Sequence, residues 1–377
     1  MNKKTIVSSI ALILVFLLTL TGCAGNTTSQ KAETTPPQNT DKTAIGAEIP
    51  AKIAQKKDGI KIMVIRKIGG DDHTAQFLAG AKQEGESLGF KVDTFSANGD
   101  TAKFHDAIAQ ALEKDYDGFI ISHGDDAATV DDVKKIVAKG KFVVTFDSNP
   151  GVADIDGVTL TSQDDEALAL LSFKQLLQDH SGKANIVYLW VDGYPAMVNR
   201  NRIYKALQDK YPGVKEVERF GVAAADTSVQ TQNAVAAILA KHPKGEIDAI
   251  WATWDAFAIG AARAVKEAGR TEIKIYGIDV SNADLQTIQE KDSPWIATAA
   301  VDPKLIGAVD IRLLVKKIAG EPTPKYYDLD ASLITQSKLQ TSPSPVNMET
   351  LSSIIPSWGK STAFDEPWFQ TLRANKK

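Results

Sequence analysis

The chain has 377 residues, of which 43% are hydrophobic, and its formal net charge at pH 7 is −4. This composition is typical of a globular protein, and the length exceeds what one hydrophobic core usually holds, which predicts two lobes. The slight acidic excess and the lack of a basic run argue against nucleic acid as a partner.

The N-terminus has the pattern of a lipoprotein signal peptide. Lys3 and Lys4 precede an apolar stretch, Ile10–Leu20, which is followed by Thr21-Gly22-Cys23. The stretch is too short to span a bilayer comfortably, which takes about 20 apolar residues. We expect residues 1–22 to be a signal peptide and Cys23 to be the lipidation site, its thiolate taking up a diacylglycerol.

Cys23 is the only cysteine in the chain, so an intramolecular disulfide is excluded. The residues that follow it are rich in Thr, Ser, Gln and Pro and offer little to bury. We therefore expect residues 23–58 to form a lipidated, disordered tether and the folded part to begin near Gly59.

From Gly59 onward, short apolar runs alternate with amphipathic helical patterns. In the first half, strands are predicted at 60–65, 90–95, 118–121 and 142–146, and helices at 75–88, 102–114 and 127–139. After about Thr161 the alternation restarts. Helices are predicted at 166–178, 199–210, 229–241, 257–268 and 283–290, and strands at 184–190, 214–221, 247–252, 273–278 and 296–300. Repeated βαβ units predict parallel sheets whose crevice lies at the carboxyl ends of the strands.

Several short stretches, in this order and spacing, resemble type I periplasmic binding proteins of ABC importers, in the ribose-binding and simple-sugar branch, from about Gly59 to Lys338. The stretches are Ala79-Gly80-Ala81 with Ser87-Leu88-Gly89-Phe90, Thr145-Phe146-Asp147-Ser148, Ile250-Trp251-Ala252-Thr253-Trp254-Asp255 with Ile259-Gly260-Ala261, and Tyr276-Gly277-Ile278-Asp279. The resemblance implies an α/β fold of two doubly wound, Rossmann-like lobes with parallel sheets, joined by a three-stranded hinge.

The same resemblance gives the expected lobe boundaries. Hinge crossings are expected near Thr161, Val301 and Tyr327. The N-terminal lobe is then 59–161 plus 302–327, and the C-terminal lobe is 162–301 plus 328–340. Residues 341–377 form a C-terminal extension with several aromatic residues, which we expect to dock on a lobe, with contact to a partner as the alternative.

The function that the resemblance implies is capture of a sugar or similar polyhydroxylated ligand outside the cytoplasmic membrane. Hinge closure around the ligand would precede its delivery to an ABC permease, by a lipid-anchored monomer that uses no cofactor and no metal. One alternative keeps the binding but reports the closed form to a membrane sensor kinase or chemoreceptor. A weaker alternative is a carbohydrate-active enzyme, because crevice carboxylates can also form an acid and base pair.

Candidate ligand-binding residues follow the predicted strands. Asp147 comes directly after an apolar strand and matches the family's sugar-binding aspartate, although Asp147-Ser148-Asn149-Pro150 is also good turn chemistry. Asp279 occupies the same place after a strand of the second lobe. Trp254 and Asp255 stand where the family has Asn-Asp, with a ring to stack on a sugar and a carboxylate to accept hydroxyl protons. The alternatives are that Asp255 caps a helix and that Trp254 packs between lobes.

The remaining candidates come from loops and a helix start. The family's ligand-binding arginine matches either Arg200 or Arg202, one of which is expected to point inward. The first loop has Asp72 and His73 where relatives carry aromatic residues, which points to a polar ligand, with a metal site as the weaker alternative. Asp125 is a further candidate of the same type.

Overall fold

The structure is a computed structural model that describes residues 46–56 and 59–376, all within one compact unit of the chain. The expected signal peptide, residues 1–22, and the expected lipidation site, Cys23, lie outside the described residues. Within the described part, no helix has both the length and the apolar character needed to cross a bilayer.

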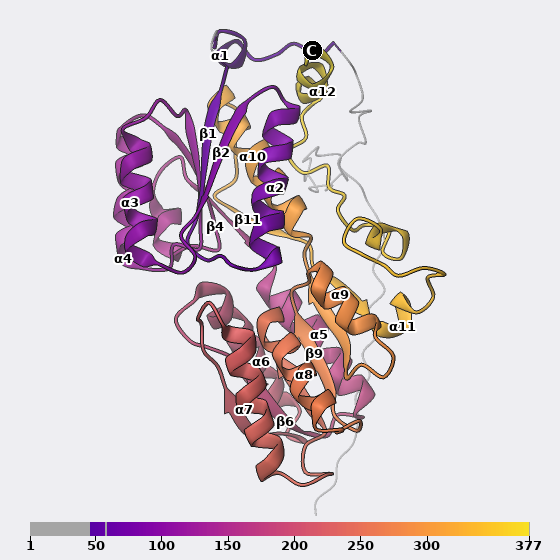
Figure 1. The fold of residues 1–377 in the computed structure, drawn as a ribbon. Coiled ribbons are helices and arrows are strands. Elements are labelled where there is room, and N and C mark those ends of the chain that lie inside the picture. Colours follow the sequence, from indigo (N-terminus) through magenta and orange to yellow (C-terminus); the bar gives the residue numbers. More distant parts are fainter. Residues whose placement is uncertain (1–45, 57–58, 377) are drawn as a thin grey trace, which may run out of the picture. The chain divides into compact units, whose positions relative to one another are not determined.

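The N-terminal lobe is built on a six-stranded parallel sheet (Figure 1). Its spatial order is β11 (Tyr326–Leu329), β5 (Thr159–Gln163), β4 (Phe142–Phe146), β3 (Gly118–Ser122), β1 (Lys61–Arg66) and β2 (Lys91–Ser96). The central strand β3 is buried along its whole length, as expected for a sheet covered on both faces.

The C-terminal lobe repeats this design with a second six-stranded sheet. Its spatial order is β12 (Ser332–Thr335), β10 (Trp295–Ala300), β9 (Lys274–Ile278), β8 (Ala249–Ala252), β6 (Ala184–Leu189) and β7 (Val214–Phe220). All neighbours pair in parallel except the edge strand β12, which is antiparallel to β10. The prediction of two doubly wound lobes is confirmed, with this one antiparallel edge strand added.

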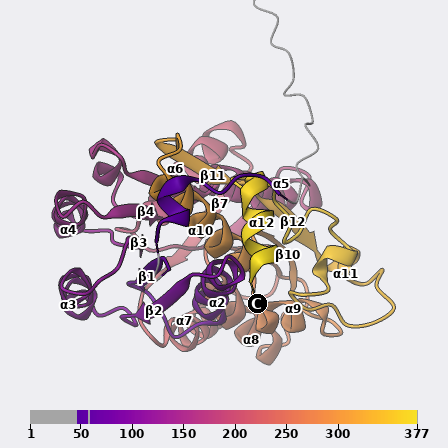
Figure 2. The same cartoon turned by 90° about the horizontal axis from the view of Figure 1, so that it is seen from above.

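Helices cover both faces of each sheet. In the N-terminal lobe they are α2 (Asp72–Ser87), α3 (Thr101–Leu112), α4 (Ala127–Ala138) and α10 (Pro303–Ala319), together with the short helices α1 (Ala51–Ala54) and η1 (Pro150–Asp154). Figures 1 and 2 show α3 and α4 on one face of the sheet, and α2 and α10 on the other. The C-terminal lobe has α5 (Asp165–Asp179), α6 (Pro195–Lys210), α7 (Thr227–Lys241), α8 (Asp255–Glu267), α9 (Asn282–Gln289) and α11 (Gln336–Leu339).

Local sequence explains where these helices start. The side chains of Asp71, Asp100, Asp126 and Asp164 each accept a hydrogen bond from a backbone N–H of the first turn of α2, α3, α4 and α5. Such caps replace the partners that the first amides of a helix lack. At the other end of α2, Gly89 takes a positive φ of 83°, which turns the chain into β2.

The chain passes between the two sheets three times. The passages follow β5 at Gln163, β10 at Ala300 and β11 at Leu329, so that each lobe is assembled from separate stretches of sequence. Strand β5 therefore belongs wholly to the N-terminal sheet, two residues beyond the boundary expected from the sequence.

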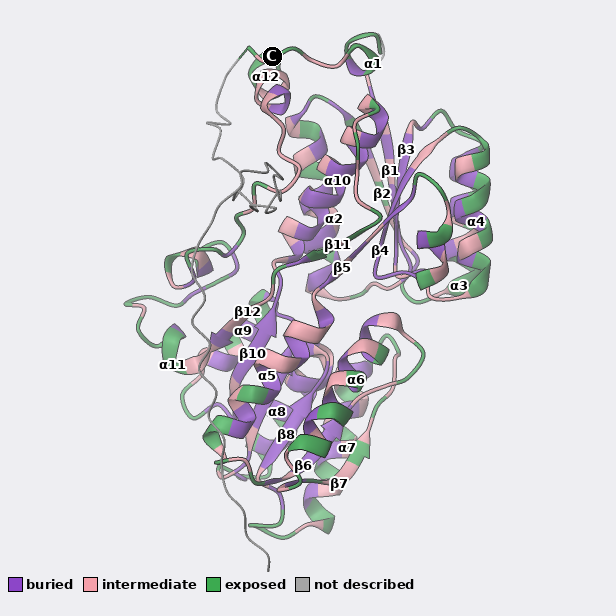
Figure 3. Cartoon of the chain, turned by 180° about the vertical axis from the view of Figure 1, so that it is seen from behind, coloured by how far each residue is buried: buried purple, intermediate pink, exposed green. Residues whose placement is uncertain are grey.

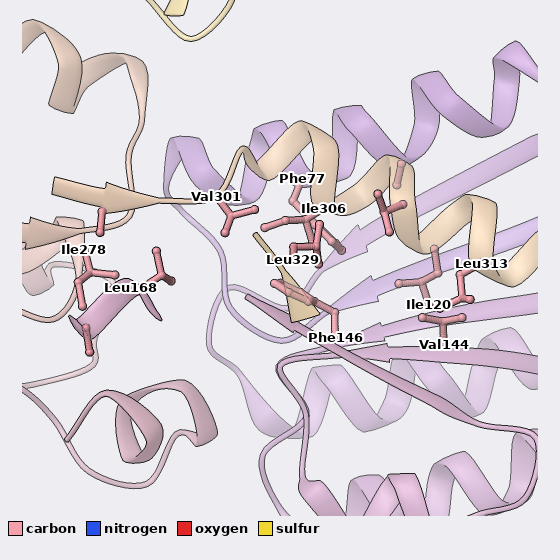
Figure 4. Packing of buried hydrophobic residues seen from close by; sticks show 14 of the residues in the cluster. Phe77, Ile120, Val144, Phe146, Leu168, Ile278, Val301, Ile306, Leu313 and Leu329 are labelled. Carbon is pink, nitrogen blue, oxygen red and sulfur yellow. The ribbon is translucent and has the colours of Figure 1, made fainter. Parts of the chain in front are cut away.

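The hydrophobic core lies on both faces of the sheets, where the strands are buried (Figure 3). Figure 4 shows part of this core, where Phe77 from α2 and Ile306 from α10 pack against Phe146 and Leu329 in the N-terminal lobe. The Phe77 and Phe146 rings stack with centroids 5.4 Å apart. Phe146 directly precedes Asp147, so this packing anchors a strand end that reaches the gap between the lobes.

Both ends of the described chain are folded onto the lobes. Helix α1 lies within the stretch expected to be a disordered tether, and its Ile53 is buried against the core, so ordered packing begins before Gly59. The extension contains η2 (Leu351–Ser353) and α12 (Pro367–Asn375). Its first part packs in the core of the C-terminal lobe, through Leu351 and Trp358.

The second part of the extension contacts the N-terminal lobe. Trp368 and Phe369 of α12 are buried in that core, and Arg373 Nη2 donates to Glu84 Oε1 at 2.6 Å. The extension therefore docks on both lobes rather than on one.

Candidate functional site

A cavity of about 210 Å³ lies where the strand ends of the two lobes face each other. Its lining comes from the loops after β1, β2, β3 and β4 in one lobe and after β6, β7, β8 and β9 in the other. This is the crevice expected at the carboxyl ends of parallel strands. Five of the residues predicted from the sequence line it, namely His73, Asp147, Arg200, Trp254 and Asp279.

Asp147 and Asp279 hold equivalent places in the two lobes. Each follows the last residue of a strand, and each backbone N–H donates to the neighbouring strand, from Asp147 to Thr161 O at 3.0 Å and from Asp279 to Ala299 O at 2.8 Å. Both residues have positive φ, 44° and 72°. Few residues other than Gly, Asn and Asp adopt this backbone conformation readily, and it recurs at functional sites.

Arg200 ties the C-terminal wall of the cavity together. Its guanidinium donates to both carboxylate oxygens of Asp279, at 3.0 and 3.2 Å, and to Asp165 Oδ1 at 2.9 Å. Burial lowers the pKa of Arg200, but the adjacent Asp279 and Asp165 raise it by more, so the group stays charged. Arg200 is 1% exposed. The sequence left Arg200 and Arg202 as alternatives, and in the structure only Arg200 points inward, while Arg202 lies on the surface.

Arg66 is the corresponding buried cation of the N-terminal wall. It donates to Thr74 Oγ1 and Ser122 Oγ, both at 3.1 Å, and its Nη2 lies 3.2 Å from His73 Nδ1. Burial and the neighbouring Arg66 charge lower the pKa of His73 to about 4. His73 is therefore neutral at pH 7, and because its Nδ1 faces a donor, its Nε2 carries the proton.

Three buried polar atoms at this site have no hydrogen-bond partner in the described structure. They are His73 Nε2 and both carboxylate oxygens of Asp147. Burial and repulsion by Asp165 raise the pKa of Asp147 well above its usual range, against the attraction of Arg200 and Arg66. Leaving such groups unpaired is costly, and native proteins rarely do so without a functional reason. One donor and two acceptors are thus available to a ligand in the cavity.

Gln163 completes the polar wall at the hinge. With its amide oriented to satisfy both groups, its nitrogen donates to Asp279 Oδ1 at 3.2 Å and its oxygen accepts from Arg200 Nη2 at 3.3 Å. Gln163 is the last residue of β5, where the chain passes to the C-terminal lobe. It therefore connects the hydrogen-bond network of Arg200 to the hinge.

Four predicted site residues do not line the cavity. Asp125 forms an ion pair with Lys67, and Arg202 pairs with Glu166 at the surface. Asp72 accepts the Asn282 backbone N–H at 3.0 Å, which is a hydrogen bond between the lobes.

Asp255 is buried at the start of α8, where its Oδ1 accepts from Ala256 N at 2.7 Å. Its pKa is raised well above the usual range by burial and by the nearby Asp284 carboxylate. Asp255 is thus the first residue of α8 and not its N-cap, a place that Trp254 takes without a side-chain cap hydrogen bond, so the capping alternative for Asp255 is not what the structure has.

Several lining residues were not predicted from the sequence. They include Arg66, Asp71, Gln163, Met197 and the run Ala223-Ala224-Ala225. Arg66 is the last residue of a strand, and a basic residue at that position could have predicted that it lines the cavity. The alanines carry no chemical signature, so only the three-dimensional structure brings them to the cavity.

The metal alternative for the first loop finds no support among residues 46–56 and 59–376. No group of three or more His, Cys, Asp and Glu side chains there is arranged to hold a metal ion. Asp71, Asp72 and His73 point to different partners, a helix amide, the other lobe and Arg66.

Comparisons with known proteins agree with this geometry. The periplasmic binding protein domain family matches residues 62–322. The ribose import binding protein RbsB of Haemophilus influenzae is 24% identical over 68% of this chain and 85% of its own length.

Two solved structures extend the likeness beyond the domain match. The crystal structure of a sugar ABC transporter protein from Yersinia enterocolitica is 53% identical, covers 88% of this chain and 99% of its own, and has a TM-score of 0.84. A 5-methylthioribose transporter solute-binding protein from Thermotoga lettingae, solved with 5-methylthioribose, is 31% identical, covers 84% and 98%, and has a TM-score of 0.79.

These relatives are binding components of transporters and not enzymes. The duplicated sheets, the three passages between them and the cavity at the strand ends are the same features that the motifs from Ala79 to Asp279 predicted. The chain therefore belongs to the type I periplasmic binding protein family, in its simple-sugar branch.

Proposed function

We propose that this protein binds a monosaccharide or a close derivative in the cavity between its lobes and delivers it to an ABC importer. The observation that carries the proposal is the set of three unpartnered buried atoms, His73 Nε2 and the two oxygens of Asp147. A sugar hydroxyl both donates and accepts, so a few hydroxyls can satisfy all three atoms at once.

The charges of the C-terminal wall favour a neutral, hydroxyl-rich ligand. Arg200 is already paired with Asp279 and Asp165, so no cation of that wall is left over for an anionic ligand. Hydrogen bonds to charged groups contribute about 1.5–3 kcal/mol each, enough to replace the water that the hydroxyls give up. Trp254 adds a flat ring at the cavity wall for the apolar face of a sugar.

The relatives support the same ligand class. The protein from Haemophilus influenzae is a ribose import binding protein, and the one from Thermotoga lettingae was crystallised with 5-methylthioribose. Ribose is a pentose and 5-methylthioribose is a pentose derivative, so we propose a pentose-sized sugar for this chain.

Binding is coupled to closure of the lobes about the three passages. The Asn282 N–H to Asp72 contact joins the lobes beside the cavity and stabilises the closed arrangement. Closure excludes water and completes the hydrogen-bond shell of the ligand. The permease then recognises the closed form, in which both lobes present one continuous surface.

We further propose that Cys23 anchors the mature protein to the outer face of the cytoplasmic membrane, as a monomer. A diacylglycerol together with N-acylation holds a protein at a bilayer far more firmly than one chain. In cell fractionation, the wild-type protein should stay with the membranes and a Cys23→Ala variant should not; equal distribution of the two would contradict the anchor.

The experiment that tests the proposed function is a thermal-shift screen of the full chain against pentoses, hexoses and polyols. A ligand at about one hundred times its dissociation constant adds about 2.7 kcal/mol to the free energy of unfolding. Loss of uptake of the selected sugar in cells without the protein would separate import from signalling through a sensor kinase or chemoreceptor. A screen in which no sugar raises the melting temperature contradicts the proposal.

A further inference from the structure

The cavity has two chemically different ends. Charged and amide groups come from the strands next to the hinge, with Asp147 after β4, Gln163 at the end of β5 and Asp279 after β9. The loops after the edge strands β2 and β7 bring Asn98, Gly99 and the run 223–225, of which only Asn98 has a polar side chain. The order of the strands therefore predicts a gradient from polar at the hinge to apolar at the outer edge.

Two long side chains increase this difference, because they carry their charged groups toward the hinge. Arg66 and Arg200 start from outer elements, β1 and α6, but their guanidinium groups reach Ser122 and Asp279 of inner strands and loops. We call the hinge end of the cavity the inner compartment, defined by Arg66, His73, Asp147, Arg200 and Asp279. Among the described residues, the fully buried side-chain atoms at the cavity that lack a hydrogen-bond partner all belong to this compartment.

The outer compartment is the opposite end, defined by Ile68, Val191, Met197 and 223–225. None of these side chains can donate a hydrogen bond, and only the Met197 sulfur is a weak acceptor. Asp71, Asn98 and Tyr194 bring polar side chains to the neighbouring loops, where the Asp71 carboxylate caps α2 and Asn98 Oδ1 accepts from Ser96 Oγ at 3.1 Å. A ligand hydroxyl placed against the apolar side chains of this compartment would lose water without finding a replacement among them.

The alanine run is held in a defined conformation. The Ala224 N–H donates to Thr227 Oγ1 at 2.9 Å, and the Thr227 hydroxyl faces Ala224 O at 2.8 Å. The loop starts at Gly221, where a Cβ would come within 1.9 Å of Trp190 O, so the close packing against β6 demands glycine. Because the backbone polar groups are partly satisfied within the loop, the surface left for a ligand is mainly methyl groups.

We infer that the ligand is an amphipathic sugar whose hydroxyls occupy the inner compartment and whose short, uncharged apolar substituent, such as an alkylthio group, occupies the outer compartment. This inference rests on the proposed sugar-binding function and adds the feature of the cavity that would select one sugar over another. The polar groups hold any pentose of suitable shape, while the outer compartment rejects a hydroxyl and accepts an apolar group in its place.

The test compares two probes that share a ring and differ at one end, ribose and 5-methylthioribose, by isothermal titration calorimetry on the full chain in mild detergent. One methylene in an apolar pocket changes affinity about 10- to 200-fold, so 5-methylthioribose should bind at least about ten-fold tighter than ribose. An Ala224→Asn variant, which places an amide in the outer compartment, should lose most of that preference, with 5-methylthioribose weakened more than ribose.

The matched control is Ala138→Asn, an exposed alanine at the end of α4 and outside the cavity, which should keep the preference. If ribose binds as tightly as 5-methylthioribose, the inference fails and the proposed function stands. If Ala224→Asn weakens both sugars equally, the outer compartment does not select the substituent, and the inference fails as well. If neither these sugars nor a wider sugar panel binds, the proposed function falls with it.

Discussion

Replacing Asp147 by Asn should strongly weaken ligand binding without destabilising the empty protein. Asp147 is 4% exposed, and neither carboxylate oxygen has a hydrogen-bond partner in the described structure. Asn keeps nearly the same shape and tolerates the positive φ of 44° at this position. It also turns one acceptor into a donor and removes the charge.

The magnitude follows from the bonds lost. If a sugar donates one hydroxyl to each oxygen, Asp147→Asn loses one charge-assisted hydrogen bond and weakens the other, about 3 kcal/mol in total. The dissociation constant should then rise about 100-fold. At a sugar concentration one hundred times the wild-type dissociation constant, the ligand stabilises the wild type by about 2.7 kcal/mol and the variant by about 0.4 kcal/mol.

Thermal unfolding with and without the sugar measures both effects. Because burial raises the pKa of Asp147, an uncharged amide costs no more than the carboxylate, so the empty variant should melt no lower than the wild type. Asp255→Asn serves as the control, since Asp255 also follows a strand but does not line the cavity. A variant at position 147 that binds as tightly as the wild type, or an equal loss in the control, would refute this reasoning.

Three further predictions concern buried charge. Arg200→Met leaves Asp165 and Asp279 without their cation, and breaking such a buried pair should lower the unfolding free energy in urea by about 3–5 kcal/mol. The control Arg202→Met, at an exposed position, should change that free energy by less than about 0.5 kcal/mol. Similar losses for the two variants would contradict the network around Arg200. The pKa of His73 is depressed from 6.5 to about 4 in the folded protein. The contribution of neutral His73 to the unfolding free energy is therefore fully present above pH 6.5, and about 3 kcal/mol of it is lost as the pH falls to 4. His73→Gln should flatten that part of the pH profile, and an unchanged slope would count against a neutral His73. Burial raises the pKa of Asp310 to about 8. The folded protein therefore favours the neutral form of Asp310, and the free energy of unfolding falls as the pH rises toward 8. Asp310→Asn should raise the melting temperature at pH 8 and have little effect at pH 4, and a lower melting temperature at pH 8 would show that the carboxylate is needed.

The sequence predicted the fold well because its signals are local. The apolar runs that form β1, β3, β4 and β9 are short and bounded, and the aspartates that cap α2, α3, α4 and α5 mark helix starts. The docked extension was less predictable, because nothing local to Trp368 shows that it is buried in the core of the N-terminal lobe. Ile53 is a similar case, a single apolar residue in a polar stretch.

For the site, the position after a strand was a good guide at Asp147 and Asp279 and a poor one at Asp255. In the first two, a positive φ directly after the strand brings the residue to the cavity lining. Asp255 comes three residues after the end of β8 and is already the first residue of α8, so it is buried beside Asp284.

Helix geometry explains the two arginines. At about 100° per residue, positions two apart face nearly opposite sides of α6, so that only one of Arg200 and Arg202 can face inward. The sequence shows this alternation but does not show which face is buried. That depends on Asp165 and Asp279, which are far away in the chain and close in the fold.

The most direct test of the central claim is a crystal structure of the protein with the sugar that the screen selects. The account predicts the sugar between the lobes, with hydroxyls within hydrogen-bond distance of both Asp147 oxygens and of His73 Nε2. A sugar bound elsewhere on the surface, with those three atoms still unpartnered, would contradict it.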